Sequence, residues 1–79
     1  MLTYKAAYKY VDVGVHAHVI DFPAAITCGA DLTETRRLLA SALLDLAELS
    51  LENGESLPRP DPLCSDPDAD LEEPLHLHL

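Results

Sequence analysis

The sequence predicts a small α+β domain with the element order β-β-β-α-β, in which one helix packs on one face of a small antiparallel or mixed sheet. Three observations support this prediction. Residues 2–20 contain two stretches with a period of two, residues 31–53 carry a helical period, and residues 75–79 alternate once more. Side chains two apart share a face of a strand, whereas those three or four apart share a face of a helix.

The helix is the most strongly indicated element. Asp31 followed by Glu34 is typical of a capped helix start, and Asn53-Gly54 is typical of a helix end. Leu44 and Leu51 lie about a third of a turn from the apolar face and seven residues apart, so we interpret them as a candidate partner surface. The alternative is that strand or tail residues cover them. The expected buried stripe consists of Leu32, Thr35, Leu38, Leu39, Ala42, Leu43, Leu46 and Leu49.

Three strands are expected before the helix. Residues 2–11 and 15–20 form a hairpin around a turn at 12–14, and residues 25–28 form a short third strand. Pro23 ends the second strand because proline has no amide to donate to a neighbouring strand. Cys28 is expected to be a small buried side chain with a free thiol.

The remainder divides into a connector and a last strand. Residues 1–54 form the β-β-β-α core of a single domain, residues 55–74 a connector rich in proline and aspartate, and residues 75–79 the fourth strand. A helical crossover and a long connector suit parallel pairing of this strand with a neighbour, most simply the first strand.

Size and charge narrow the function classes. A chain of 79 residues forms one domain at most, and burial of only about 60% of its unfolded surface favours a dimer or larger assembly. The net charge of -9 argues against direct nucleic-acid binding. No apolar stretch approaches the ~20 residues of a membrane span, and no signal peptide is apparent, so a cytoplasmic protein without membrane contact is expected.

The acidic segment near the C-terminus is the main functional feature of the sequence. Residues 61–79 hold six acidic side chains and no basic one. Such a segment is attracted to a positive partner surface, although it can also be a linker that only keeps the protein soluble. The candidate partner-binding residues here are Asp66, Asp68, Asp70, Glu72 and Glu73.

Metal binding and catalysis receive little support. The His-x-His pairs His16/His18 and His76/His78 are weak metal candidates, because residues two apart on a strand project to one face. If the first strand separates them, they lie about 9.5 Å apart, so solvated outward-facing histidines and no cofactor are expected. Carboxylates of the turn and the helix cap do not form a convincing shared metal site, and no enzymatic activity is expected.

Six segments, taken in their order along the chain, form a recognisable set: residues 2–6, 21–23, 26–29, 31–32, 37–43 and the G-E-x-L-P-x-P stretch at 54–60. In order and spacing they resemble the HicB-like antitoxins of bacterial type II toxin-antitoxin systems. Ala24 stands where this family often has glycine after its D-F-P step, which affects only the local turn.

The resemblance implies a truncated ribonuclease H-like fold without nuclease activity. It also implies binding and neutralisation of a HicA toxin, a small RNA-cleaving protein. Many such antitoxins carry a C-terminal DNA-binding domain, which is not expected in these 79 residues. The alternative function is an orphan homo-oligomeric domain that associates through a sheet edge or through the Leu44/Leu51 strip and has no toxin partner.

Overall fold

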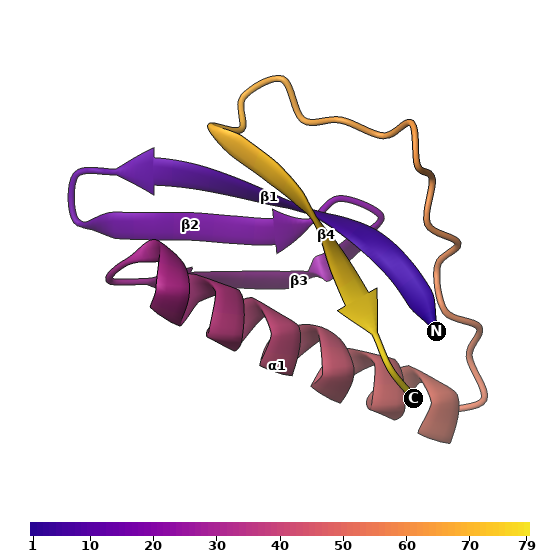
Figure 1. Ribbon diagram of the computed structural model, residues 1–79. Helices are drawn as coiled ribbons and strands as arrows, with labels where there is room; N and C mark the ends of the chain where they lie inside the picture. Colours follow the sequence, from indigo (N-terminus) through magenta and orange to yellow (C-terminus); the bar gives the residue numbers. More distant parts are fainter.

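Four strands and one helix follow one another in the predicted order (Figure 1). The computed structural model describes residues 1–79. Its sheet is antiparallel throughout, with the strand order β3-β2-β1-β4, and this confirms the predicted α+β class. The elements are β1 (Leu2–Val11), β2 (Gly14–Val19), β3 (Phe22–Gly29), α1 (Leu32–Glu52) and β4 (Leu71–Leu77).

The predicted parallel pairing of the last strand is wrong. β4 runs antiparallel to β1, with Leu2 opposite Leu77 and Tyr8 opposite Leu71. The reason is the path of residues 53–70. The helix carries the chain away from the β1–β2 turn, and the connector then returns along the sheet to that end before β4 begins (Figure 1). The Asp70 amide is already bonded to the Tyr8 carbonyl there, at 2.8 Å. The chain therefore crosses the length of the sheet twice between β3 and β4, once in the helix and once in the connector. This second crossing makes β4 antiparallel to β1.

Two strand boundaries also differ from the prediction. β4 spans Leu71–Leu77 and not residues 75–79, so it contains Glu72, Glu73 and Pro74. A proline is tolerated there because β4 is an edge strand. β3 begins at Phe22 and includes Pro23, on the opposite edge of the sheet, with an irregular register between His18 and Val19 of β2.

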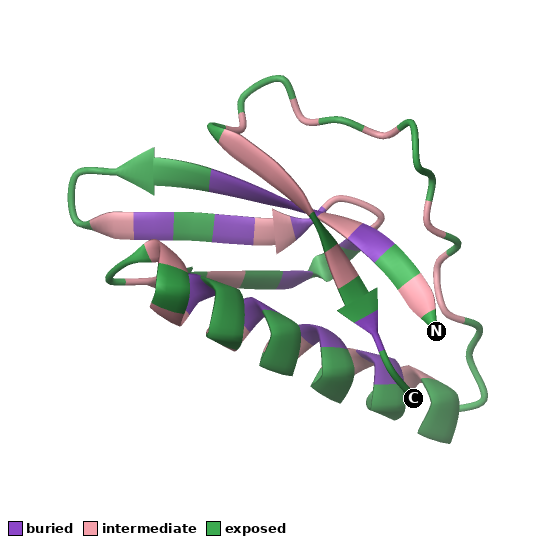
Figure 2. Cartoon of the chain, viewed as in Figure 1, coloured by how far each residue is buried: buried purple, intermediate pink, exposed green.

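The core lies between α1 and one face of the sheet (Figure 2). Tyr4, Ala6 and Tyr8 of β1 contribute to it, and Tyr4 meets Phe22 edge-on with ring centroids 5.9 Å apart. The helix contributes four buried residues, Thr35, Leu39, Leu43 and Ala47.

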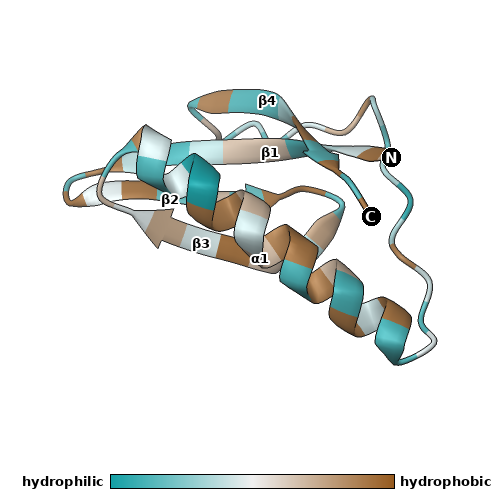
Figure 3. Ribbon diagram, turned by 60° about the horizontal axis from the view of Figure 1, so that its bottom comes forward, coloured by the Kyte–Doolittle hydropathy of each residue, from teal (hydrophilic) through white to brown (hydrophobic).

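The predicted buried stripe is correct along the first part of α1 and wrong at its end. Leu49 is 53% exposed, whereas Ala47, outside the expected stripe, is fully buried. The buried residues of α1 follow one another at a spacing of four, and Leu49 lies about 200° around the helix from Ala47, away from that line. The hydropathy of α1 alternates around the helix accordingly (Figure 3). Although α1 has 21 residues, it does not contain an apolar stretch long enough to cross a membrane.

Both helix ends have the predicted chemistry. The Glu34 amide donates to Asp31 Oδ1 at 2.8 Å, and Glu34 Oε2 accepts from the Ala30 amide at 3.0 Å, one residue before the cap. At the other end, Gly54 adopts a positive φ of 74°, which glycine tolerates without a steric penalty.

Candidate partner-binding surface

The connector is fixed on the sheet face that points away from α1. Lys5 alternates along β1 with the buried Tyr4 and Ala6, so its side chain leaves on this outer face. There Lys5 Nζ donates to the Cys64 carbonyl at 2.7 Å and to the Pro62 carbonyl at 3.3 Å. Ala7, also on the outer face, is only 2% exposed. Residues 61–66 are therefore an attached strap across this face.

Four of the five acidic candidates are engaged within the chain. Glu72 lies 3.9 Å from Lys5, Asp70 lies 3.8 Å from Lys9, and Asp66 lies 3.5 Å from His18. Asp70 also accepts the Tyr10 amide at 2.8 Å, and Glu72 accepts from the Ser65 hydroxyl at 2.9 Å. These carboxylates order the connector. Asp68 is the remaining candidate, exposed and without an ion pair.

Glu73, the fourth engaged acid, lies on the helix side of the sheet. It faces Ala6 across the strands and receives two hydrogen bonds from Arg36, at 2.7 and 2.9 Å. The Arg36 guanidinium lowers the pKa of the Glu73 carboxyl. Burial, and then the neighbouring Glu73 carboxylate, raises the pKa of Tyr8 to about 12. This fork-like pair connects the edge strand β4 to α1.

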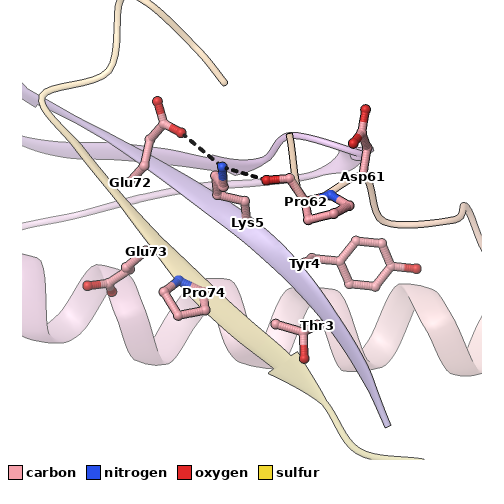
Figure 4. Close-up of a pocket in the computed structure, with 8 residues that line it drawn as sticks. All are labelled: Thr3, Tyr4, Lys5, Asp61, Pro62, Glu72, Glu73 and Pro74. Carbon is pink, nitrogen blue, oxygen red and sulfur yellow. Dashed lines mark hydrogen bonds and ion pairs between the residues drawn. The ribbon is translucent and has the colours of Figure 1, made fainter. Parts of the chain in front are cut away.

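A cavity of about 400 Å³ remains between the strap and the outer face (Figure 4). Lys5 reaches into it toward Glu72 and the Pro62 carbonyl, and these groups satisfy its ammonium. The cavity contains no unsatisfied buried polar side chain. Its lining is Thr3, Tyr4, Lys5, Asp61, Pro62, Glu72, Glu73 and Pro74.

The solvent side of α1 differs from the connector because its acids have no partners. Asp45, Glu48 and Glu52 are exposed and form no ion pair. The last turn carries no basic residue, so the negative charges of Glu48 and Glu52 lie near the negative end of the helix dipole without a positive charge to offset them. This arrangement is unfavourable for the isolated chain. Leu44 and Leu51, between these acids, are 36% and 49% exposed. Neither strand nor tail covers them.

The histidine pairs do not converge. β1 separates β2 from β4, so His16 and His18 lie two strands away from His76, while His78 follows the end of β4. His18 faces Asp66, and His76 Nδ1 lies 2.9 Å from the Thr3 hydroxyl. No three side chains of the metal-ligating types gather at one point.

The predicted burial of Cys28 is wrong. Its side chain lies on the outer face of β3, where the strap does not reach, and is exposed. In the register of β2 and β3, Cys28 stands directly opposite His16. Sequence reasoning missed this neighbour, and the internal partners of the acidic segment, because both depend on strand register. One feature of the sequence pointed to partners for the acidic segment: Lys5 and Lys9 share one face of the first predicted strand.

Comparison with known proteins shows that this fold occurs in a solved structure. One solved structure, the N-terminal domain of Burkholderia pseudomallei antitoxin HicB, superimposes with a TM-score of 0.78. The alignment covers 99% of this chain and 100% of that domain, at 17% sequence identity. No family model and no curated protein matches the sequence. The chain therefore has the fold of that antitoxin domain over its whole length.

Proposed function

We propose that this chain is an antitoxin-type binding module that neutralises a small RNA-cleaving HicA-like toxin by direct contact. The observation that carries the proposal is the likeness, along the full chain, to the N-terminal domain of a HicB antitoxin. The segments that resemble this family lie in or beside β1, β3 and α1 and at the start of the connector; they are residues 2–6, 21–23, 26–29, 31–32, 37–43 and 54–60. In this proposal the module itself has no catalytic role and acts in the cytoplasm.

Charge supports a basic partner. A protein that cleaves RNA must present positive groups to phosphates, and a chain with a net charge of -9 attracts such a surface. The connector acids are largely engaged by Lys5, Lys9, Arg36 and His18. We therefore assign the principal contact to the solvent side of α1, and a secondary role to Asp68.

The helix surface combines two properties of a binding site. Leu44 and Leu51 supply apolar area that gains free energy when water is excluded. Asp45, Glu48 and Glu52 surround them with charges that have no internal partner. A basic partner would relieve the repulsion between Glu48, Glu52 and the helix end.

The test needs a HicA-like toxin, and the first candidate to look for is a short, basic open reading frame beside the gene for this chain. Co-expression should restore growth to cells that produce the toxin, and the purified chain should stop RNA cleavage by the toxin in stoichiometric amounts. The chain alone, with magnesium or manganese, should leave RNA intact. Absence of rescue together with absence of a complex would reject the antitoxin function.

A double variant tests the helix surface separately. Leu44→Glu with Leu51→Glu should abolish the complex, because two charges would replace the apolar contact, while the far-ultraviolet circular dichroism should stay unchanged. Leu63→Glu is the matched control, since Leu63 is 88% exposed in the connector. Retention of full affinity by the double variant would move the contact elsewhere and leave the antitoxin function standing.

A further inference from the structure

His16 and Cys28 form a pair of metal-ligating side chains that the proposed function does not use. They face each other across β2 and β3 on the outer face of the sheet. Side chains directly opposite each other in antiparallel strands have Cβ atoms about 4.5–5.5 Å apart. Both side chains are exposed, and together with Ile26 and Thr27 they line an open depression of about 420 Å³.

This spacing suits a transition metal. Zinc binds imidazole nitrogen at about 2.0 Å and thiolate sulfur at about 2.3 Å, so two such ligands in a tetrahedral site lie roughly 3.5 Å apart. His16 and Cys28 reach that separation from opposed strands by rotation of their side chains. The next histidine along β2, His18, faces the Asp66 carboxylate and is not available to complete the set.

One chain supplies only two ligands, and no third metal-ligating side chain gathers with them. A structural zinc site needs four. A second copy related by a two-fold axis would supply the same two residues again and complete a Cys2His2 set.

The same region of the sheet is also the part best suited to a second copy. β3 is an edge strand, and its sequence from Phe22 to Gly29 contains no charged residue. Each edge strand contains one proline, but only the other edge, β4, carries charged residues, Glu72 and Glu73, which discourage association with another chain. The strap covers the outer face beside Lys5, whereas Ile26, near the pair, is 67% exposed.

We propose that His16 and Cys28 of two copies bind one zinc ion, and that this shared site joins the copies through the outer face of β2 and β3. On binding, the Cys28 thiol forms the sulfur–zinc bond and its proton passes to the solvent. The proposal does not depend on the antitoxin function, because it uses the sheet and not the helix surface.

The experiment uses the full chain, reduced and stripped of metal. Titration with zinc should saturate at one ion per two chains and convert the sample to a dimer by light scattering. Cobalt in place of zinc should give the thiolate-to-cobalt charge-transfer absorption and the intense visible bands of a tetrahedral site. Cys28→Ser and His16→Gln should each abolish the absorption and the metal-dependent dimer.

Three variants serve as controls and alternatives. Cys64→Ser and His78→Gln should behave like the unmodified chain, because neither residue lies beside the pair. Metal binding that survives Cys28→Ser but is lost in His76→Gln would overturn the proposal in favour of the other histidine pair. Saturation at one ion per chain without a dimer would also overturn it, as would no binding at all. Circular dichroism without metal confirms that each variant is folded.

Discussion

At the scale of single residues, the clearest constraints are places where two parts of the chain touch closely. A Cβ atom built on Gly29 would lie 2.6 Å from Thr35 Oγ1 and 3.1 Å from the Thr35 amide nitrogen. Thr35 is itself fixed, since its hydroxyl donates to the Asp31 carbonyl at 2.6 Å. The end of β3 and the first turn of α1 are therefore packed too closely for any side chain at position 29.

Gly29→Ala should lower the free energy of unfolding by about 1–3 kcal/mol, the range for overpacking in a tight site. Urea denaturation followed by circular dichroism measures it. Gly54→Ala is the control for glycine removal as such: position 54 has nothing within 4 Å, and only its positive φ of 74° opposes alanine. That control should cost about 1 kcal/mol. Equal stability of Gly29→Ala and the unmodified chain would contradict the contact.

Tyr8 gives the second prediction at this scale. Its pKa is raised to about 12 by burial and by Glu73, above the ordinary value of 10.0. The unfolded chain therefore loses the phenolic proton first, so stability is intact below pH 10 and falls as the pH rises toward 12. At 1.36 kcal/mol per unit of pKa, the full loss is about 2.7 kcal/mol.

Tyr8→Phe should flatten this alkaline fall, as measured by urea denaturation at a series of pH values. Part of the fall should remain, because burial also raises the pKa of Tyr4. Tyr10→Phe, which alters a half-exposed ring, should retain the steep dependence. An unchanged slope in Tyr8→Phe would show that other groups are responsible.

At the scale of elements, sequence reasoning succeeded where the signal is local. The hairpin, the start and end of α1 and most of its buried face follow from side-chain period and capping residues within a few positions of one another. The direction of β4, in contrast, cannot be inferred from the residues of the strand itself. It depends on the path of residues 53–70, and that path is fixed by contacts with Lys5, more than fifty positions away in the sequence.

The exposure of Cys28 and Leu49 eluded sequence reasoning for a related reason. Period alone identifies which side chains share a face, but not how far a neighbouring element extends over that face. Cys28 on the outer face of β3 and Leu49 on the flank of α1 are both exposed. The candidate site was therefore predictable in part. The helical period places Leu44 and Leu51 outside the apolar face, but it left open whether strand or tail residues cover them. The internal partners of Asp66, Asp70, Glu72 and Glu73 were not predicted.

Attachment of the strap gives a prediction for the connector. Lys5→Gln should release residues 61–66, because it removes the ion pair with Glu72 and the charged donor to the Pro62 and Cys64 carbonyls. Amide hydrogen exchange should accelerate in the connector, while β2 and α1 keep their protection. Lys9→Gln is the matched control, since Lys9 contacts only Asp70 at the start of β4. Slow exchange in Lys5→Gln would mean that the remaining contacts, such as those of the Asp61 amide with Asp21 and of Asp66 with His18, hold the strap without Lys5.

At the scale of the whole molecule, the negative charge is unevenly available. Three of the five basic side chains, Lys5, Lys9 and Arg36, are paired with acids of the connector and β4. On the solvent side of α1, Asp45, Glu48 and Glu52 form no ion pair, and Arg37 is the one exposed basic side chain there without an acidic partner. Charges accelerate an encounter mainly within a Debye length of the contact, about 10 Å at 0.1 M salt. The position of a charge change should therefore matter as much as its size.

Two variants with the same net charge separate the helix from the connector. Asp45→Asn, Glu48→Gln and Glu52→Gln together change the net charge from -9 to -6, and so do Asp66→Asn, Asp68→Asn and Asp70→Asn together. If the proposed basic toxin is the partner, the helix variant should bind it with an on-rate several-fold lower than that of the unmodified chain, and with a weaker salt dependence. The connector variant should show a smaller decrease. Stopped-flow association at two ionic strengths measures both on-rates.

Two outcomes would contradict this expectation. If the connector variant is the slower of the two, the strap and not the helix faces the toxin. If both variants match the unmodified chain, charge does not guide this encounter, and the contact must depend on apolar side chains such as Leu44 and Leu51.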